Sequence, residues 1–528
     1  MVFPMSEHKA IFKSASIISA FTVLSRITGF VRDVLLANLF GTQAAAQAFF
    51  VAFKIPNAFR DIMGEGAGNA AFVPVFCECL QKRPKADFLK LANSLLRVIF
   101  GISILLVLAG IVFSPAIVRL VAPGFSNDIA KFGLTVKLNR ILFPYLALIT
   151  LSAFMMAVSN SLKSFAAPAF SSVVFNIALI LGIFFITHFA VPNPVYALCV
   201  AVLAAAVAQV LFQFPPLWKM GIDFKKGGVF AEVFKEPAIR KVGRLILPRI
   251  VGTSIYQLNI FVDTIVASFA FWVGDGAIAA IYYANRIIQF PFSIFGVALS
   301  NAALPNMSAN SANQDIEKFK TTLLFCLRAV FLGVIPLTVG ILVFAQPLVQ
   351  VIFQRGSFDA YSTNITAFAV FFYAFGLVSY VGVRFLSHAF YALQDTMTPV
   401  KVSAFGLLMN VILISLFVFV FRFQISGLAL ASSISASVNF YLLYRALKNR
   451  IGFNFSHDFS SMVVRSFAVS VVVVGIVFWA WQQWAYSNPT FLKMCVVFCL
   501  GVVLYAAGLW VCRVKEAKEL LLWLRKRR

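Results

Sequence analysis

Basic side chains deep inside long apolar stretches are the residues of this 528-residue sequence with the most informative chemistry. A charge in such a stretch is costly, so it usually faces a cavity or a partner. The deep acids are Asp33, Asp61, Glu65 and Asp263, and the deep cations are Arg26, Arg32, Lys54, Arg60, Arg249, Arg286 and Arg384. Seven cations against four acids leave a net charge of +3. A polyanionic ligand in a water-filled cavity would neutralise that surplus.

The spacing of these charges places several of them on common helix faces. Arg26 and Asp33 are seven residues apart, and Lys54 and Asp61 repeat this spacing. Seven residues make almost two helical turns, so each pair returns to nearly the same face. The short connection 41–43 makes the two helices antiparallel neighbours, and their charged stripes can therefore face one cavity. The alternative is a set of internally satisfied salt bridges between helices, which would leave the positive surplus unexplained.

The elements that carry these charges are predicted to be transmembrane helices. Hydrophobic residues make up 61% of the chain, charged residues 12%, and the mean hydropathy is +0.91, which excludes an ordinary soluble domain. Apolar runs of about 20 residues, long enough to cross a bilayer, recur throughout. We predict fourteen, over 14–40, 44–78, 94–121, 133–158, 169–190, 195–218, 243–272, 277–308, 320–345, 361–392, 400–421, 425–446, 462–485 and 491–512.

The distribution of Lys and Arg among the loops predicts the orientation, because loops rich in these residues stay cytoplasmic. The largest groups lie at 219–244 and 513–528. The segments on the other side hold only Arg119, Lys131, Lys137, Arg140, Arg355, Arg422 and Lys493. Both termini are therefore expected in the cytoplasm, and the net charge of +25 is mostly a topology signal. Nucleic-acid binding is not expected, because the basic loops are short and carry no interleaved stacking aromatics.

Glycine and proline mark places where the charged helices are expected to bend. The first helix has Gly29 between its two arginines, and the second contains Pro56, Gly64, Gly66, Gly68 and Pro74. Both residue types weaken a helix, and transporters build their binding sites at broken helices near the middle of the membrane. Close packing of neighbouring helices through small residues is the alternative explanation.

An internal repeat predicts the architecture. Residues 68–74 read GNAAFVP and residues 300–305 read SNAALP, so that Asn69 and Asn301 are 232 residues apart, and the same offset relates Lys54 to Arg286. The repeat contains six predicted helices, so both halves enter the membrane in the same direction. We expect an all-α polytopic membrane protein with two six-helix lobes, related by a pseudo-two-fold axis along the membrane normal and facing a central cavity. The predicted parts are 1–220, 221–450, and 451–528 with two extra helices and a basic cytoplasmic tail.

The sequence also resembles a known family along its whole length, namely the MurJ/MviN lipid II flippases of the multidrug/oligosaccharidyl-lipid/polysaccharide exporter superfamily. The resemblance rests on a series of segments in order: 25–33 (SRITGFVRD), 48–57 (AFFVAFKIPN), 65–67 (EGA), 122–125 (APGF), 283–286 (YANR) through 290–291 (FP), 354–356 (QRG), and 390–391 (FY) through 398–400 (TPV).

This resemblance implies a substrate that composition alone could not name: lipid II, an undecaprenyl pyrophosphate that carries a peptidoglycan unit. It implies that Arg26, Arg32, Arg60 and Arg286 line the cavity and meet the pyrophosphate, and that Asp33 orients Arg32. The full set of substrate-binding candidates adds Lys54, Asn57 and Glu65 on the second charged stretch. The two extra C-terminal helices would form a groove for the prenyl tail.

Two departures from the family bear on this expectation. Gln47 stands where several members carry an acid. Some members bind sodium with acids on the seventh and eleventh helices, where this chain offers Asp263 and Asn410 and where the predicted eleventh helix has no acid. Asp263 and Asn410 are therefore only possible ion-coupling residues. Coupling to the membrane potential is the simpler hypothesis, and neither a cofactor nor a metal site is expected.

Alternating access is the expected mechanism, in the cytoplasmic (inner) membrane of a bacterium. Besides lipid II, we expect membrane lipids as partners, cell-wall synthesis proteins as candidate partners, and a monomer. Alternatives are a flippase for another prenyl-linked sugar, an exporter of amphipathic drugs, and a membrane enzyme that acts on prenyl pyrophosphates. Such an enzyme would usually need clustered carboxylates for Mg²⁺ or a positioned acid and base, whereas the deep acids here are single.

Overall fold

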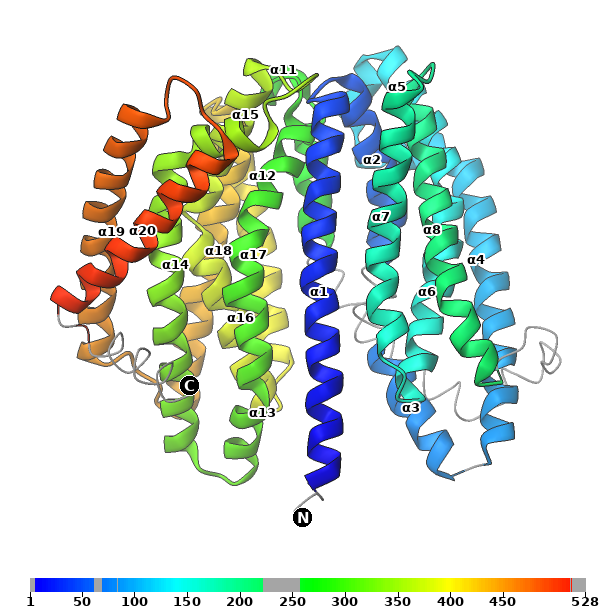
Figure 1. Cartoon of the computed structure of the whole chain (residues 1–528), viewed down its shortest axis with the longest axis horizontal. Coiled ribbons are helices and arrows are strands. Elements are labelled where there is room, and N and C mark those ends of the chain that lie inside the picture. The colour runs from blue at the N-terminus through cyan, green and yellow to red at the C-terminus, as the bar shows by residue number, and fades with distance from the viewer. Residues whose placement is uncertain (1–4, 61–68, 83, 222–256, 513, 515–528) are drawn as a thin grey trace. The chain divides into compact units, whose positions relative to one another are not determined.

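The computed structural model of the chain describes residues 5–60, 69–82, 84–221, 257–512 and 514, and all regular structure in these residues is helical. The chain divides into two compact units, Met1–Phe269 and Ala270–Arg528. The fold class is therefore the predicted all-α one (Figure 1).

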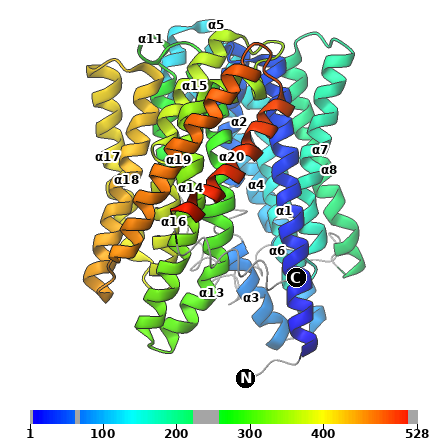
Figure 2. The ribbon, with the colours of Figure 1, turned by 60° about the vertical axis from the view of Figure 1, so that its left-hand side comes forward.

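The first unit is built from helices, and short turns join them where the structure describes the connections. Its elements are α1 (Met5–Phe40), α2 (Ala44–Arg60), α3 (Asn69–Lys82), α4 (Lys85–Val121), the short 3₁₀ helix η2 (Pro123–Asn127), α5 (Ile129–Leu142), α6 (Pro144–Ser161), α7 (Ala166–His188), α8 (Pro194–Lys219) and the helix Gln257–Ala267. Helix α7 packs along both α1 and α8, and both views show these neighbours side by side (Figures 1 and 2).

The second unit is also built from helices, and it includes the added C-terminal pair. Its elements are α11 (Ala270–Val273), α12 (Ala277–Pro291), η3 (Phe292–Ala298), α13 (Leu299–Ala312), α14 (Ile316–Phe353), α15 (Ala360–Ala374), α16 (Leu377–Ala392), α17 (Met397–Ile414), η4 (Ser415–Val420), α18 (Gln424–Ile451), α19 (His457–Trp484) and α20 (Phe491–Val511). The added pair, α19 and α20, packs against α14 (Figure 2).

The predicted spans agree with these helices to within about ten residues at each end wherever the structure describes them. By length and hydropathy, ten described helices can cross a membrane, or eleven if the bent pair α15 and α16 counts as one span. The predicted number of fourteen stays a prediction. Three predicted spans are outside this count. Helix α1 carries the charged residues Arg26, Arg32 and Asp33, helix α2 has only 17 residues, and the seventh predicted span is described only in part.

The division between the two units falls after Phe269, whereas the sequence predicted a boundary after residue 220. The predicted boundary stays a prediction. Helix Gln257–Ala267 and the turn that follows it belong to the first unit by their contacts. In that turn the Ser268 hydroxyl accepts a hydrogen bond of 2.9 Å from the Gly124 backbone N–H. The C-terminal pair, which was predicted as a third part, groups with the second unit.

Each unit buries its own apolar core and leaves other apolar faces outward. In the first, Phe76, Phe88 and Phe154 form a cluster of edge-to-face rings, and Phe76 and Phe88 are fully buried. In the second, Trp481 of α19 is buried against Phe344 of α14. Other apolar side chains, such as Leu105 and Phe113 of α4 and Leu492 and Trp510 of α20, are more than half exposed. Lipid-facing helices require this distribution.

The bends predicted at proline and glycine are not seen as breaks where the structure describes those residues, because α1 runs continuously through Gly29 and α3 through Pro74. Helix α2 contains Pro56 and ends at Arg60, and α3 begins at Asn69. The glycine-rich stretch between them lies outside the described residues. The predicted repeat relates this stretch to the residues that follow Pro291 in the second unit, where the helix widens into a π-helical segment, η3. Helices α15 and α16 meet at an angle of 47°.

Candidate functional site

A tight turn connects the two charged helices, α1 and α2. Gly41 adopts a left-handed conformation with φ of 54°, which glycine tolerates without steric cost. Gln47 is 2% exposed, and its amide donates to the Thr42 carbonyl oxygen at 3.2 Å. The three-residue connection predicted between these helices is therefore confirmed, and the Gln47 amide helps to close it.

Arg32 of α1 is held on two sides within the first unit. Its Nε and Nη2 groups donate to one oxygen of Asp33, at 3.0 and 2.8 Å, and this is the pair that the family resemblance implied. Its Nη1 group donates at 2.9 Å to the side-chain oxygen of Asn176 on α7. The Arg32 side chain is 12% exposed and that of Asp33 is 1% exposed. The guanidinium plane is thus fixed by a carboxylate and an amide.

Arg26 and Asp33, which were predicted to share one face of α1, differ in burial. Asp33 is buried, whereas Arg26 is exposed. The ion pair at Asp33 comes from the adjacent Arg32. Arg32 is therefore built into a packed polar centre.

Lys54 of α2 meets the helix Gln257–Ala267. Its ammonium group donates to the Thr264 hydroxyl, which in turn donates to the Ile260 carbonyl oxygen at 2.7 Å. Asp263, next to Thr264, acts electrostatically on the Lys54 ammonium. The structure therefore brings together two predicted site residues, Lys54 and Asp263, that are more than two hundred positions apart. Thr264 is a partner that the sequence did not single out.

Four other residues of the first unit were singled out by the sequence. Asn57 is half-buried on α2. Arg60 is the last residue of α2, and its side chain lies outside the described part. Glu65 and Asp61 also lie outside the described residues.

Arg286 occupies the second unit, on α12. Its Nη2 group donates to the Tyr282 hydroxyl at 2.8 Å, and its guanidinium carbon lies 4.7 Å from the centre of the Tyr282 ring. A longer contact of 3.4 Å joins Nη1 to the Gln289 side-chain oxygen. Tyr282 and Gln289 are four and three residues from Arg286, and this helical spacing is the signal that could have found them.

Asn410, the second possible ion-coupling residue, is 1% exposed on α17 of the second unit. Asp263 belongs to the first unit. A joint role of the two in ion coupling stays a prediction.

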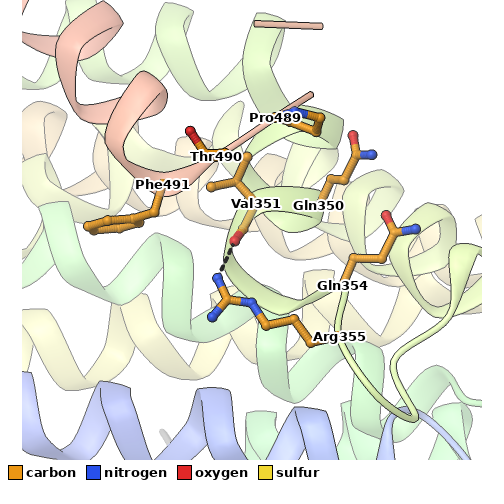
Figure 3. A pocket seen from close by; sticks show the side chains of 7 residues that line it. All are labelled: Gln350, Val351, Gln354, Arg355, Pro489, Thr490 and Phe491. Carbon is orange, nitrogen blue, oxygen red and sulfur yellow. Dashed lines mark hydrogen bonds between the residues drawn. The ribbon is translucent and has the colours of Figure 1, made fainter. Parts of the chain in front are cut away.

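A cavity of about 380 Å³ opens elsewhere in the second unit, where the end of α14 meets the start of α20 (Figure 3). Its lining residues are Gln350, Val351, Gln354, Arg355, Pro489, Thr490 and Phe491. Arg355, just beyond the end of α14, donates to the Val351 carbonyl oxygen of that helix at 2.8 Å. No predicted substrate-binding residue lines this cavity.

Comparison with known proteins identifies the family. The model of the family described as "Lipid II flippase MurJ" matches residues 36–498. The chain is 33% identical to a "Probable lipid II flippase MurJ" of Vibrio cholerae, over 98% of this chain and 99% of the relative. It is also 33% identical to a "Lipid II flippase MurJ" of Burkholderia cenocepacia, over 96% and 98%.

Solved structures agree on the fold. One described as "Lipid II flippase MurJ, inward closed conformation" superimposes with a TM-score of 0.77 at 24% identity, over 93% of this chain and 97% of that one. An inward-facing multidrug resistance MATE transporter of the MOP superfamily gives 0.68 at 16% identity, over 81% and 94%. With nearly its whole length matched, the chain belongs to the MurJ family, an integral membrane family of the MOP transporter fold.

Proposed function

We propose that this protein is a lipid II flippase, which moves undecaprenyl-pyrophosphate-linked peptidoglycan precursor from the inner to the outer leaflet. The observation that carries the proposal is the family match over nearly the whole chain. The packed Arg32 centre on α1 adds a chemical reason, because a pyrophosphate needs cationic donors in a place where water is scarce.

The arginines suit a pyrophosphate better than lysines would. A guanidinium group is planar and presents its N–H groups as a fork, which matches two phosphate oxygens at once. Arg32 keeps its plane through Asp33 and Asn176, and Arg286 keeps its position through Tyr282. Both groups are therefore preorganised, so little rotamer entropy remains to be lost when the anion binds.

The proposed cycle is alternating access, in which the pyrophosphate is captured from the cytoplasmic side and then exposed on the opposite side. The protein acts as a monomer in the bacterial inner membrane, with both termini in the cytoplasm. Equal affinity on both sides would not drive net transport. Consumption of lipid II outside the cell, or the membrane potential, supplies the bias.

Depletion in living cells tests this function. In a bacterium that has no other lipid II flippase, loss of this protein should trap labelled lipid II in the inner leaflet and stop peptidoglycan synthesis. Re-expression should restore export, whereas expression of an Arg32→Ala variant should not. Continued export of lipid II after depletion would overturn the proposal.

A second assay separates lipid II from other lipid-linked sugars. Vesicles that contain the purified protein should move labelled lipid II much faster than an undecaprenyl-linked oligosaccharide of another structure. A faster rate for the second lipid would favour the alternative substrate.

A further inference from the structure

A single amide side chain from α7 contacts several residues on one face of α1, over two helical turns. Asn176 donates to the Ser25 carbonyl oxygen at 2.9 Å, and its nitrogen lies 3.4 Å from the Thr28 hydroxyl. Its oxygen accepts the 2.9 Å hydrogen bond from Arg32. Ser25, Thr28, Gly29 and Arg32 are spaced i, i+3, i+4 and i+7, which is one helix face.

Gly29 lies directly beneath this amide. A β-carbon built at Gly29 would lie 3.4 Å from the Asn176 nitrogen, which is an ordinary van der Waals contact, so the space above Gly29 is filled by Asn176. Helices α1 and α7 run alongside each other (Figures 1 and 2). The glycine that the sequence marked as a possible bend therefore also lies under the Asn176 amide.

The two ends of the Asn176 amide contact different groups of α1. The NH₂ end is fastened to the backbone of α1 at Ser25, and the oxygen end is fastened to the guanidinium of Arg32. Asn176 itself is 6% exposed. Because the amide is planar, its anchored end fixes where its oxygen lies, and that oxygen fixes the direction of the Arg32 Nη1 group.

An amide suits this task better than a carboxylate would. Asp33 already provides one negative charge to Arg32. A second carboxylate would overcompensate the guanidinium and compete with a phosphate for it. A neutral acceptor holds the group in place while leaving the charge balance of the pair unchanged.

We propose that Asn176 is a positioning residue for Arg32, which holds the guanidinium in the plane needed to bind the pyrophosphate of the transported lipid. This inference rests on the proposed function. It assigns Asn176 no direct contact with the lipid, so its effect on binding must pass through Arg32.

A double-mutant cycle tests that dependence. The probe is lipid II with a fluorescent label on its peptide, titrated against detergent-purified protein. Asn176→Ala should weaken binding about tenfold, which is the usual scale for a hydrogen bond to a charged group. In the Arg32→Ala background, the same change should weaken binding less than about twofold.

A matched control separates positioning from general loss of packing. Asn139 of α5 is also a buried asparagine that bridges helices, since it donates to the Ala52 carbonyl oxygen at 3.0 Å and accepts from Ser114 at 2.9 Å. Asn139→Ala should lower the unfolding midpoint at least as much as Asn176→Ala does, but it should leave lipid II affinity nearly unchanged. Asn176→Asp offers a second variant of the same shape, and it should also weaken binding.

The outcomes are distinguishable. Equal losses from Asn176→Ala with and without Arg32 would show that Asn176 acts independently of Arg32, and this would overturn the inference. Normal affinity in both Asn176 variants, combined with lost affinity in Arg32→Ala, would also overturn it while leaving the proposed function intact. Wild-type affinity no greater than that of Arg32→Ala would remove the proposed role of Arg32, and the inference with it.

Discussion

At the scale of single residues, the charged groups of this protein differ in how firmly they are held. Arg32 has a carboxylate and an amide as partners, Lys54 has the Thr264 hydroxyl and the nearby Asp263, and Arg286 rests on a tyrosine ring. Groups with fixed directions can recognise a shape as well as a charge. We therefore expect substitutions that keep the charge and lose the geometry to be harmful.

Arg32→Lys is the sharpest such substitution. An ammonium group is a compact charge and cannot reproduce the planar set of bonds from Arg32 to Asp33 and Asn176. Binding of labelled lipid II should weaken about tenfold, on the scale of one charge-assisted hydrogen bond. Lys401→Arg, an exposed position on α17, makes the converse exchange as a control. Full affinity in Arg32→Lys would mean that charge alone suffices.

At the scale of elements, close contacts hold helix Gln257–Ala267 to the rest of the first unit. A β-carbon on the buried Gly124 would lie 2.3 Å from the Ser268 carbonyl oxygen, which belongs to the backbone and cannot rotate away. Gly124→Ala should lower the free energy of unfolding by about 1–3 kcal/mol through overpacking. It should also disturb the Lys54–Thr264 contact on the helix just before Ser268.

A second glycine is the control for that prediction. Gly133 lies in α5, and a β-carbon there would have no neighbour within 4 Å. Gly133→Ala should be neutral or stabilising by up to about 1 kcal/mol, because alanine favours helix more than glycine does. The measurement is thermal or denaturant unfolding of both variants in detergent. Equal stability of the two variants would contradict the packing argument.

Asp395 joins three helices at the turn between α16 and α17. Its carboxylate accepts hydrogen bonds from the Thr398 backbone and hydroxyl, at 3.0 and 2.7 Å, and pairs with Arg450 of α18. Burial alone would raise the pKa of Asp395, but these hydrogen bonds and the nearby Arg450 outweigh it and hold the pKa below its usual value.

The pH dependence follows from that direction. A carboxylate with a lowered pKa stabilises the fold above its unfolded pKa of about 3.9, and this stability is lost as pH falls through the folded value. The thermal unfolding midpoint of the wild type should therefore decrease as the pH is lowered from about 5 to about 3. Asp395→Asn should show a smaller fall over the same range. Equal slopes for the two proteins would show that Asp395 does not contribute.

Elements were the part of the structure that the sequence predicted best. Hydropathy located the helices, although it did not predict the π-helical hydrogen bonding of segment η3. Contacts between distant residues could not be predicted, because local spacing carries no information about them. Asn176 is 144 positions from Arg32, and Thr264 is 210 positions from Lys54. Tyr282, by contrast, lies one helical turn from Arg286, so this contact could have been predicted from the i, i+4 spacing.

At the scale of the whole molecule, the surplus of deep positive charge suggests how transport is driven. A charge that crosses the full membrane field gains about 2.3 kcal/mol per 100 mV. We expect an imposed potential, negative inside, to change the rate of lipid II flipping by wild-type protein in vesicles. A sodium gradient without a potential should have little effect. A response to sodium alone would contradict potential coupling and would direct attention to Asp263 and Asn410.

Flipping of labelled lipid II in vesicles by wild type, Arg32→Ala and Arg286→Ala tests the central claim most directly. Arg422→Ala is the matched control, because Arg422 stacks on the Trp272 ring at 5.7 Å, outside the set of deep cations. We predict that wild type and Arg422→Ala flip at similar rates, and that the Arg32 and Arg286 variants flip at least about tenfold more slowly. Equal rates for all four proteins would contradict the claim that these arginines carry the pyrophosphate across the membrane.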